Sequence, residues 1–230
     1  MLVHAKISLS ETNGPGKRAV IWTKGCLLRC PGCFNPETWD VPNLGTVFWF
    51  WESTESLTRW IISAKSEVGI VGLTLSGGEP IHQISYVIEL CQEVKAKCPD
   101  FSVGMFTGYT PAELNEGDYQ IFMVNTTFNP TYGADVSIEG VSLTSVDKEF
   151  KKAKWLQLQQ YLDFAIMGRY IESKKSKCPY LGSSNREIVL FSPRYKLEDF
   201  GAERQAEVIM EPAGLTQITE FPDLDLSREI

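Results

Sequence analysis

Apolar residues in this chain follow two patterns, which succeed each other along the sequence. Short apolar runs of strand length recur between longer stretches in which apolar residues return every three or four positions. The runs predict strands at about 3–9, 19–23, 69–75, 101–106, 121–124, 164–167, 188–191 and 208–210. The longer spacing predicts helices from Ser53 or Thr54 onward and over about 81–97. Strands that alternate with helices are typical of a parallel sheet with crossover helices.

The number and order of these elements predict an α/β fold, a partial, open parallel β/α barrel. The 230 residues are fewer than the ~250 of a typical closed eightfold barrel, and they suit a single domain over 1–230. Residues 126–160 break the pattern, because their first part is rich in Thr, Asn, Gly and Ser with short β-like pieces. We expect a β-rich insertion there, in the form of a hairpin.

Composition narrows the class of protein. The chain is 43% hydrophobic and carries a net charge of −7, which disfavours a general nucleic-acid binder because phosphate contacts need a basic face. It has no signal peptide pattern and no apolar stretch near the ~20 residues needed to span a bilayer, so we expect a cytoplasmic protein without membrane contact. In that compartment six cysteines indicate metal ligands or buried thiols rather than disulfides.

Three of the cysteines form a compact cluster directly after the strand predicted at 19–23. Cys26, Cys30 and Cys33 lie within eight residues and have no fourth cysteine nearby. Three soft ligands can hold a metal centre and leave one coordination position free for a substrate. Our first interpretation is a [4Fe–4S] cluster with one iron not bound by protein. The alternatives are a zinc site completed by His4 or His82, or a non-catalytic iron–sulfur electron carrier or zinc-binding module.

A second motif, Ser76-Gly-Gly-Glu-Pro80, follows the buried strand predicted at 69–75. Taken alone it is compatible with an ordinary strand-to-helix turn, in which glycines provide backbone freedom and proline opens the helix. Cys91 falls on the apolar face of the following helix, which predicts a core residue. Cys98 and Cys178 each precede proline at the end of an element, and we assign them no role.

The CxxxCxxC spacing, with Phe34 directly after Cys33, resembles the radical S-adenosylmethionine (SAM) superfamily. The resemblance implies a [4Fe–4S] cluster on Cys26, Cys30 and Cys33 whose free iron chelates SAM. Reduction of the cluster would cleave SAM and form a 5′-deoxyadenosyl radical that abstracts a hydrogen atom. The Gly77-Gly78-Glu79 segment resembles the motif of that family that contacts the methionine amino group. The resemblance thus implies a cofactor site formed by Gly32, Phe34, Gly77, Gly78, Glu79, Thr107 and Asn185.

Further segments resemble the anaerobic ribonucleotide reductase activating proteins. They are 13–16 with Arg18, 21–26, 107–109, 162–170 and 182–186. This resemblance implies a glycyl-radical enzyme as partner, a glycine Cα–H as the source of the hydrogen atom, and a low-potential electron donor such as flavodoxin. Two positions depart from the pattern, since the family often has an acidic residue near Met167 and a glutamine where Arg186 stands. An alternative with the same chemistry is a radical SAM enzyme that acts on a small molecule or a peptide, and the segment 126–160 favours it.

Overall fold

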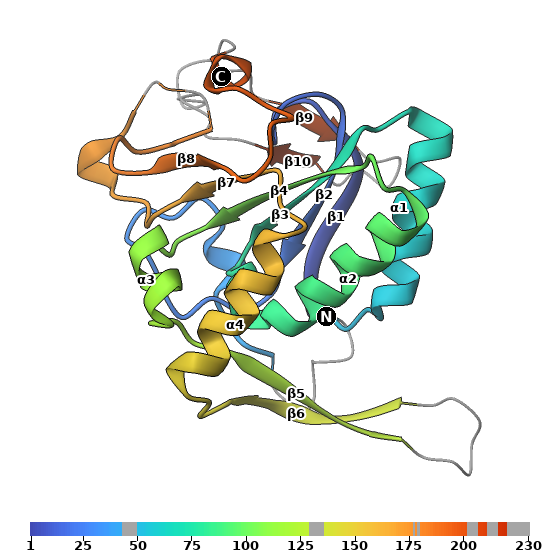
Figure 1. Ribbon diagram of the computed structural model, residues 1–230, viewed down its shortest axis with the longest axis vertical. Helices are drawn as coiled ribbons and strands as arrows, with labels where there is room; N and C mark the ends of the chain where they lie inside the picture. Colours follow the sequence, from blue (N-terminus) through green and yellow to red (C-terminus); the bar gives the residue numbers. More distant parts are fainter. Residues whose placement is uncertain are drawn as a thin grey trace.

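The fold is organised around one six-stranded sheet, seen in the computed structural model of Figure 1. The structure describes residues 1–42, 50–128, 136–176, 178, 180–201, 207–210 and 216–219. The sheet has the order β1-β2-β3-β4-β7-β8. Its strands are β1 (Val3–Ser10), β2 (Arg18–Thr23), β3 (Gly72–Gly77), β4 (Ser102–Thr107), β7 (Phe164–Met167) and β8 (Glu187–Leu190). The four central strands are parallel to one another, whereas β1 and β8 run antiparallel at the two edges.

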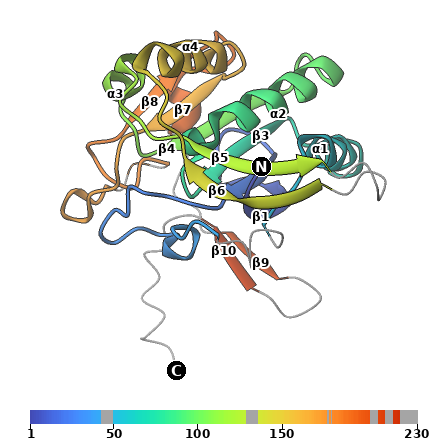
Figure 2. The same ribbon diagram turned by 90° about the horizontal axis from the view of Figure 1, so that it is seen from below.

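The helices lie together on one face of this sheet (Figure 2). They are α1 (Thr54–Val68), α2 (Ile84–Lys97), α3 (Pro111–Glu116) and α4 (Lys148–Gln159), and the main hydrophobic core lies between them and the sheet. Ser53 caps α1 by accepting a hydrogen bond from the Ser56 N–H, and Gly69 ends the helix with a left-handed φ of 70°. Because Gly69 ends the helix, β3 begins three residues later than the apolar run from 69 predicts.

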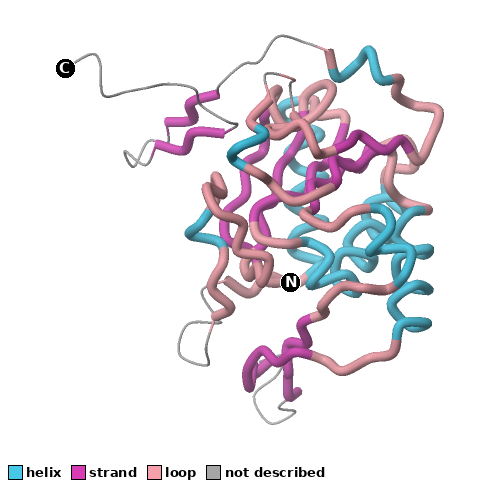
Figure 3. The backbone as a smooth tube through the Cα atoms, turned by 90° about the vertical axis from the view of Figure 1, so that its left-hand side faces the viewer, coloured by secondary structure: helices cyan, strands magenta, loops and turns pink. Residues whose placement is uncertain are grey.

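The opposite face of the sheet is also covered. Val20 and Trp22, which alternate with the core residues Ala19 and Ile21, pack there with Ile7 from β1. Every residue of β2 is buried, as expected for a strand in a sheet covered on both faces. In Figure 2 the small sheet of β9 (Glu207–Met210) and β10 (Thr216–Thr219) lies on this side, and Figure 3 shows it set apart from the main body. The strand predicted at 208–210 therefore exists but lies outside the main sheet.

The prediction that 121–124 forms a further strand of the main sheet is wrong. β5 (Phe122–Phe128) pairs with β6 (Val136–Leu143) in a separate antiparallel hairpin, and β4 pairs with β7 instead. A short apolar run specifies a strand but not its partner, and here the partner is supplied by the next segment of chain. The expected hairpin thus forms. The remainder of 126–160 contains α4, whose first turn is capped by the Asp147 side chain.

The second predicted helix is divided. Residues Pro80–Gln83 form a short 3₁₀ helix, and α2 begins only at Ile84. Among the residues described, further 3₁₀ turns occur at Pro36–Thr38, Glu172–Lys174 and Leu197–Phe200. Cys91 is completely buried in the core, as predicted from its place on the apolar face of α2. Among the residues described, no helix combines the length and apolar character that crossing a membrane requires.

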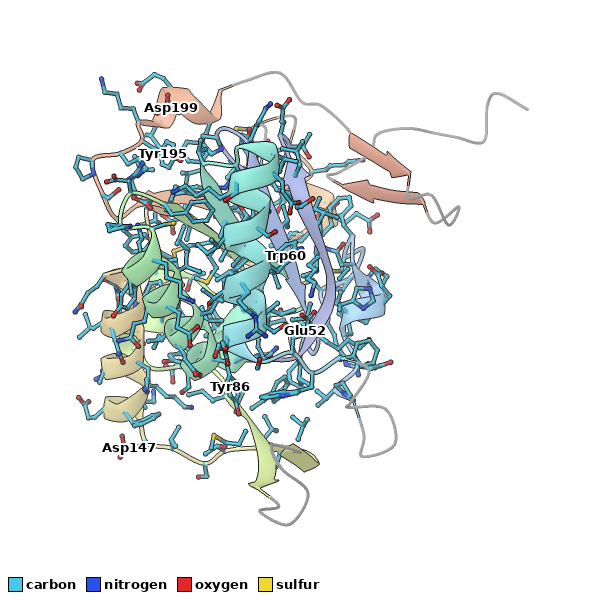
Figure 4. The ribbon with its side chains drawn as sticks, turned by 90° about the vertical axis from the view of Figure 1, so that its right-hand side faces the viewer. Glu52, Trp60, Tyr86, Asp147, Tyr195 and Asp199 are labelled. Atoms are coloured by element: carbon cyan, nitrogen blue, oxygen red, sulfur yellow. The ribbon has the colours of Figure 1, made fainter. Side chains whose placement is uncertain are left out.

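Different residues and elements lie at the two ends of the molecule. Figure 4 shows Tyr195 and Asp199 at one end, whereas Tyr86 and Asp147 lie toward the hairpin at the other. Tyr86 meets the ring of Trp51 edge-on at 5.3 Å, in a small apolar cluster that includes Leu2 and Val141 of β6. This cluster anchors the hairpin against the body of the protein.

Candidate functional site

A cavity of about 110 Å³ lies where the central parallel strands end. It is lined by residues at or just beyond the C-terminal ends of β3, β4 and β7, and by the loop that follows β2. Open α/β sheets bind ligands at this edge. The cavity brings together most of the residues singled out in the sequence: Cys26, Cys30, Cys33, Phe34, Gly77, Gly78, Glu79 and Thr107.

The cysteine loop is fixed to the protein at its base. The Gly25 N–H donates to the Thr38 carbonyl at 2.7 Å, and the Cys26 N–H donates to the Trp39 carbonyl at 2.9 Å. Gly25 has a φ of 99°, and a Cβ there would lie 2.8 Å from the Phe122 ring. The root of the hairpin therefore packs against the start of the cysteine loop, and only glycine fits between them.

The three thiols of the loop are free and share the cavity, but their surroundings differ. Cys26 is buried, whereas Cys30 and Cys33 are half-buried. Burial raises the pKa of Cys26 to about 12, with the charge of Glu79 as the next cause. Burial also raises the pKa of Cys30, and the neighbouring Cys33 raises it further. A positive centre is therefore needed to hold these groups as thiolates.

The Gly77-Gly78-Glu79 segment packs directly on the base of the cysteine loop. The Gly78 N–H donates to the Thr23 carbonyl at 2.8 Å, and the Glu79 N–H donates to the Gly25 carbonyl at 3.0 Å. A Cβ on Gly77 would lie 2.6 Å from the Trp22 Cα, and one on Gly78 would lie 2.6 Å from the Gly25 carbonyl oxygen. The two motifs thus form one unit, and the glycines are required for the close approach of two backbones.

The Glu79 carboxylate is engaged by the protein itself. It accepts hydrogen bonds from the Ile81 N–H at 3.0 Å, the Thr107 hydroxyl at 2.8 Å and the Gly108 N–H at 2.8 Å. Burial raises the pKa of Glu79 to about 7 against the effect of these donors. The side chain therefore connects the end of β3 to the end of β4, and this contact fixes the Thr107 side chain at the cavity wall.

Two residues of the expected cofactor site lie apart from the cavity lining. Asn185 is exposed, and its side-chain amide donates to the Arg169 carbonyl at 2.8 Å. Gly32 is exposed with a φ of 71°, and a Cβ there would lie 2.9 Å from a Glu172 carboxylate oxygen. A role for Asn185 and Gly32 in cofactor binding stays a prediction.

The histidines considered as zinc ligands also lie outside the lining. His82 is fully buried, and its Nε2 lies 3.1 Å from the Tyr109 hydroxyl oxygen. Burial lowers the pKa of His82 to about 3. His4 stacks on Phe50, away from the cavity. Neither histidine joins the three cysteines.

Several side chains that line the cavity were not expected in the cofactor site, among them those of Trp39, Tyr170 and Arg186. Trp39 follows the 3₁₀ turn after the cysteines, Tyr170 contacts Phe34 edge-on at 4.8 Å, and Arg186 precedes β8. The sequence did draw attention to Arg186, because an arginine stands where the related family has a glutamine. It gave no such sign for Trp39 or Tyr170.

The residues present fit an iron–sulfur cluster with a further ligand. The three thiols open on one cavity, and two lining side chains, Trp39 and Arg186, each have a buried N–H donor without a partner among the residues described. Unpaired buried donors are costly and call for an acceptor, which cluster sulfur or a ligand carboxylate provides. Within the described ranges, no three Cys, His, Asp or Glu side chains are already gathered into a metal-binding group. The fit therefore rests on the cavity that the three thiols share and on the two unpaired donors.

Comparison with known proteins supports this interpretation. A family described as "4Fe-4S single cluster domain" matches residues 12–141, which is more than half of the chain. The anaerobic ribonucleoside-triphosphate reductase-activating protein of Vibrio cholerae is 37% identical over 120 residues, 50% of this chain and 74% of the relative. Its counterpart in Escherichia coli K12 is 34% identical over 125 residues, 53% of this chain and 77% of the relative. The counterpart of Enterobacteria phage T4 is 28% identical over 178 residues, 76% of this chain and 85% of the relative.

The fold and the cavity thus define an α/β iron–sulfur protein with a single [4Fe–4S] cluster. Its relatives make the assignment narrower. The chain belongs to the family of anaerobic ribonucleoside-triphosphate reductase-activating proteins, within the radical SAM enzymes. It is an enzyme, and its cofactors are a [4Fe–4S] cluster and SAM.

Proposed function

We propose that this protein generates a glycyl radical on a partner enzyme, an anaerobic ribonucleotide reductase. The observation that carries the proposal is the joining of the three-cysteine loop and the Gly77-Gly78-Glu79 segment in one cavity without a fourth cysteine in its described lining. The three relatives described above are named as activating proteins of anaerobic ribonucleoside-triphosphate reductase.

In this proposal Cys26, Cys30 and Cys33 hold the cluster. When bound, the cluster and SAM supply an electron transfer and a carbon radical able to take a hydrogen atom. Residues of the chain itself bind SAM and exclude water. The Gly77-Gly78 backbone offers close approach to the amino end of SAM, and Phe34 with Tyr170 walls the cavity against water.

The finer architecture is part of the same proposal. The parallel strands β2, β3, β4 and β7 form the partial barrel of a single domain over 1–230, with 126–160 as its insertion. An open sheet edge suits this function, because a loop of the partner must reach the cofactor. The electron comes from a low-potential donor such as flavodoxin, and neither nucleic acid nor a membrane takes part.

One anaerobic experiment tests the chemistry. The reconstituted protein, given SAM and dithionite, is expected to form 5′-deoxyadenosine, and Cys30→Ala is expected to abolish it. Cys178→Ala is the matched control, because Cys178 is exposed and outside the cavity lining, and it should retain full activity. Equal product from the wild type and Cys30→Ala would contradict the role of Cys30.

A second measurement tests the partner. Addition of anaerobic ribonucleotide reductase is expected to yield the doublet of a glycyl radical in its electron paramagnetic resonance spectrum. If SAM is cleaved while the reductase stays without a radical and a small molecule or peptide is consumed, the activating function is wrong and the alternative substrate class holds.

A further inference from the structure

Arg186 places a half-buried side chain in the wall of the cavity. Its Nη1 donates to the Leu181 carbonyl at 3.2 Å and its Nη2 to the Ile166 carbonyl at 3.5 Å. The guanidinium lies over the Phe106 ring, 5.8 Å from the centroid. Its Nε is buried and has no hydrogen-bond partner among the described residues. The protein thus surrounds a full positive charge with two neutral carbonyls and a ring.

This charge has no ion pair within the described part of the chain. Burial lowers the pKa of Arg186 to about 10, and the groups that oppose this effect are Glu79, Cys30 and Cys33. A cation that is partly removed from water is unfavourable unless an anion compensates it. The compensating groups here are the carboxylate at the cavity wall and two of the three proposed cluster ligands.

A second arginine nearby provides the contrast. Arg169 also acts on Cys30, but its Nη1 lies 2.7 Å from a Glu113 carboxylate oxygen and its side chain is 40% exposed. Its charge is therefore already paired and screened by solvent. Arg186, in contrast, lines the cavity and has no acidic partner among the residues that the structure describes.

We propose that Arg186 is the counter-charge of the metal centre and that it raises the reduction potential of the cluster. This inference rests on the proposed ligation by Cys26, Cys30 and Cys33. A cluster bound by three thiolates is anionic, and uptake of one electron from a low-potential donor adds one further negative charge. A fixed cation favours the reduced form more than the oxidised form, and net charge and hydrogen bonds to sulfur are known determinants of cluster potentials. The unpartnered Nε–H provides such a donor.

The test is a redox titration of the reconstituted protein, monitored by electron paramagnetic resonance without SAM. Two neutral variants, Arg186→Gln and Arg186→Met, remove the charge, and Met also keeps the length and apolar packing over Phe106 if Gln folds poorly. We expect both to bind the cluster with a potential more negative than that of the wild type. Arg186→Lys keeps the charge and is expected to remain close to the wild type.

The control variant is Arg59→Gln on α1, which removes one exposed charge that is paired with Glu55. Its potential should equal that of the wild type. If a folded neutral variant loads the same amount of iron at an unchanged potential, the inference about Arg186 is wrong while the proposed function stands. If the wild type itself binds no cluster, the proposed function fails first, so the two failures are distinguishable.

Discussion

The Thr107 hydroxyl donates a 2.8 Å hydrogen bond to the Glu79 carboxylate, joining the ends of two neighbouring parallel strands at the wall of the cavity. Both side chains are at most 2% exposed. The contact lies beside the Gly77-Gly78 turn, which in turn rests on the base of the cysteine loop. One buried carboxylate thus fixes the relative positions of the ends of β3 and β4 and of the two motifs that the sequence makes most prominent.

A double-mutant cycle measures this relationship. Thr107→Val removes the donor at constant shape, and Glu79→Ala removes the acceptor. We expect a coupling free energy of about 1–3 kcal/mol in urea unfolding of the metal-free protein, because a buried charge-assisted hydrogen bond is lost only once. Additive effects of the two substitutions would show that the bond adds no stability.

Gly77→Ala should be strongly destabilising. Gly77 has a φ of 90°, and the added Cβ would meet the Trp22 backbone at 2.6 Å, so strain and overlap act together. We expect a loss of more than about 3 kcal/mol in the free energy of unfolding. Gly69→Ala is the matched control, with a φ of 70° and no atom within 4 Å, and should cost only about 1–2 kcal/mol. Equal losses would mean that the Trp22 backbone moves aside freely.

Asp163 is expected to make part of the free energy of unfolding depend on pH. Burial tends to raise the pKa of Asp163, but hydrogen bonds from the Ser192 hydroxyl and the Val103 N–H, with the charges of Lys95 and Arg194, hold it below its usual range. A carboxyl group with a lowered pKa in the folded state stabilises the protein above its unfolded pKa of about 3.9, and this stabilisation is lost as the pH falls through the folded value.

Asp163→Asn is accordingly expected to cost about 2 kcal/mol at pH 7. The difference from the wild type should shrink as the pH falls below about 4. Thermal or urea unfolding at several pH values measures it. A difference that stays constant down to pH 2 would show that the charge of Asp163 is unimportant and that only its shape matters.

We expect that lysine cannot replace Arg18 without a loss of stability. It is completely buried at the start of β2, where its Nε donates to the Thr74 hydroxyl at 2.7 Å and its Nη2 to the Leu73 carbonyl at 2.7 Å. Its Nη1 lies 3.3 Å from the Tyr195 hydroxyl, whose position Figure 4 shows. Lysine keeps the charge but not the planar set of donors, so we expect a loss of at least about 2 kcal/mol. Arg59→Lys on the surface should be neutral, and a neutral Arg18→Lys would contradict this role.

The sequence by itself determined the local elements and the chemistry of the ligands. Apolar patterns predicted β1, β2, β4, β7 and β8 to within a residue or two, because a strand that packs against a core carries apolar residues along its length. The spacing of Cys26, Cys30 and Cys33 indicated an iron–sulfur cluster, since three thiols so close together can act on one centre. The glycines of the Gly77-Gly78 turn were visible for a similar reason, because backbone freedom is a property of the residue type.

Only the tertiary structure decided which segments meet. The apolar run at the start of β5 gave no sign that its partner is β6 rather than the main sheet, because pairing depends on distant chain. The bond between Glu79 and Thr107 likewise joins residues far apart in sequence. The exposed position of Asn185 and the place of Arg186 in the cavity wall depend on such contacts as well. Burial and charge at the cavity depend on all the strands that end there, and no local pattern records them.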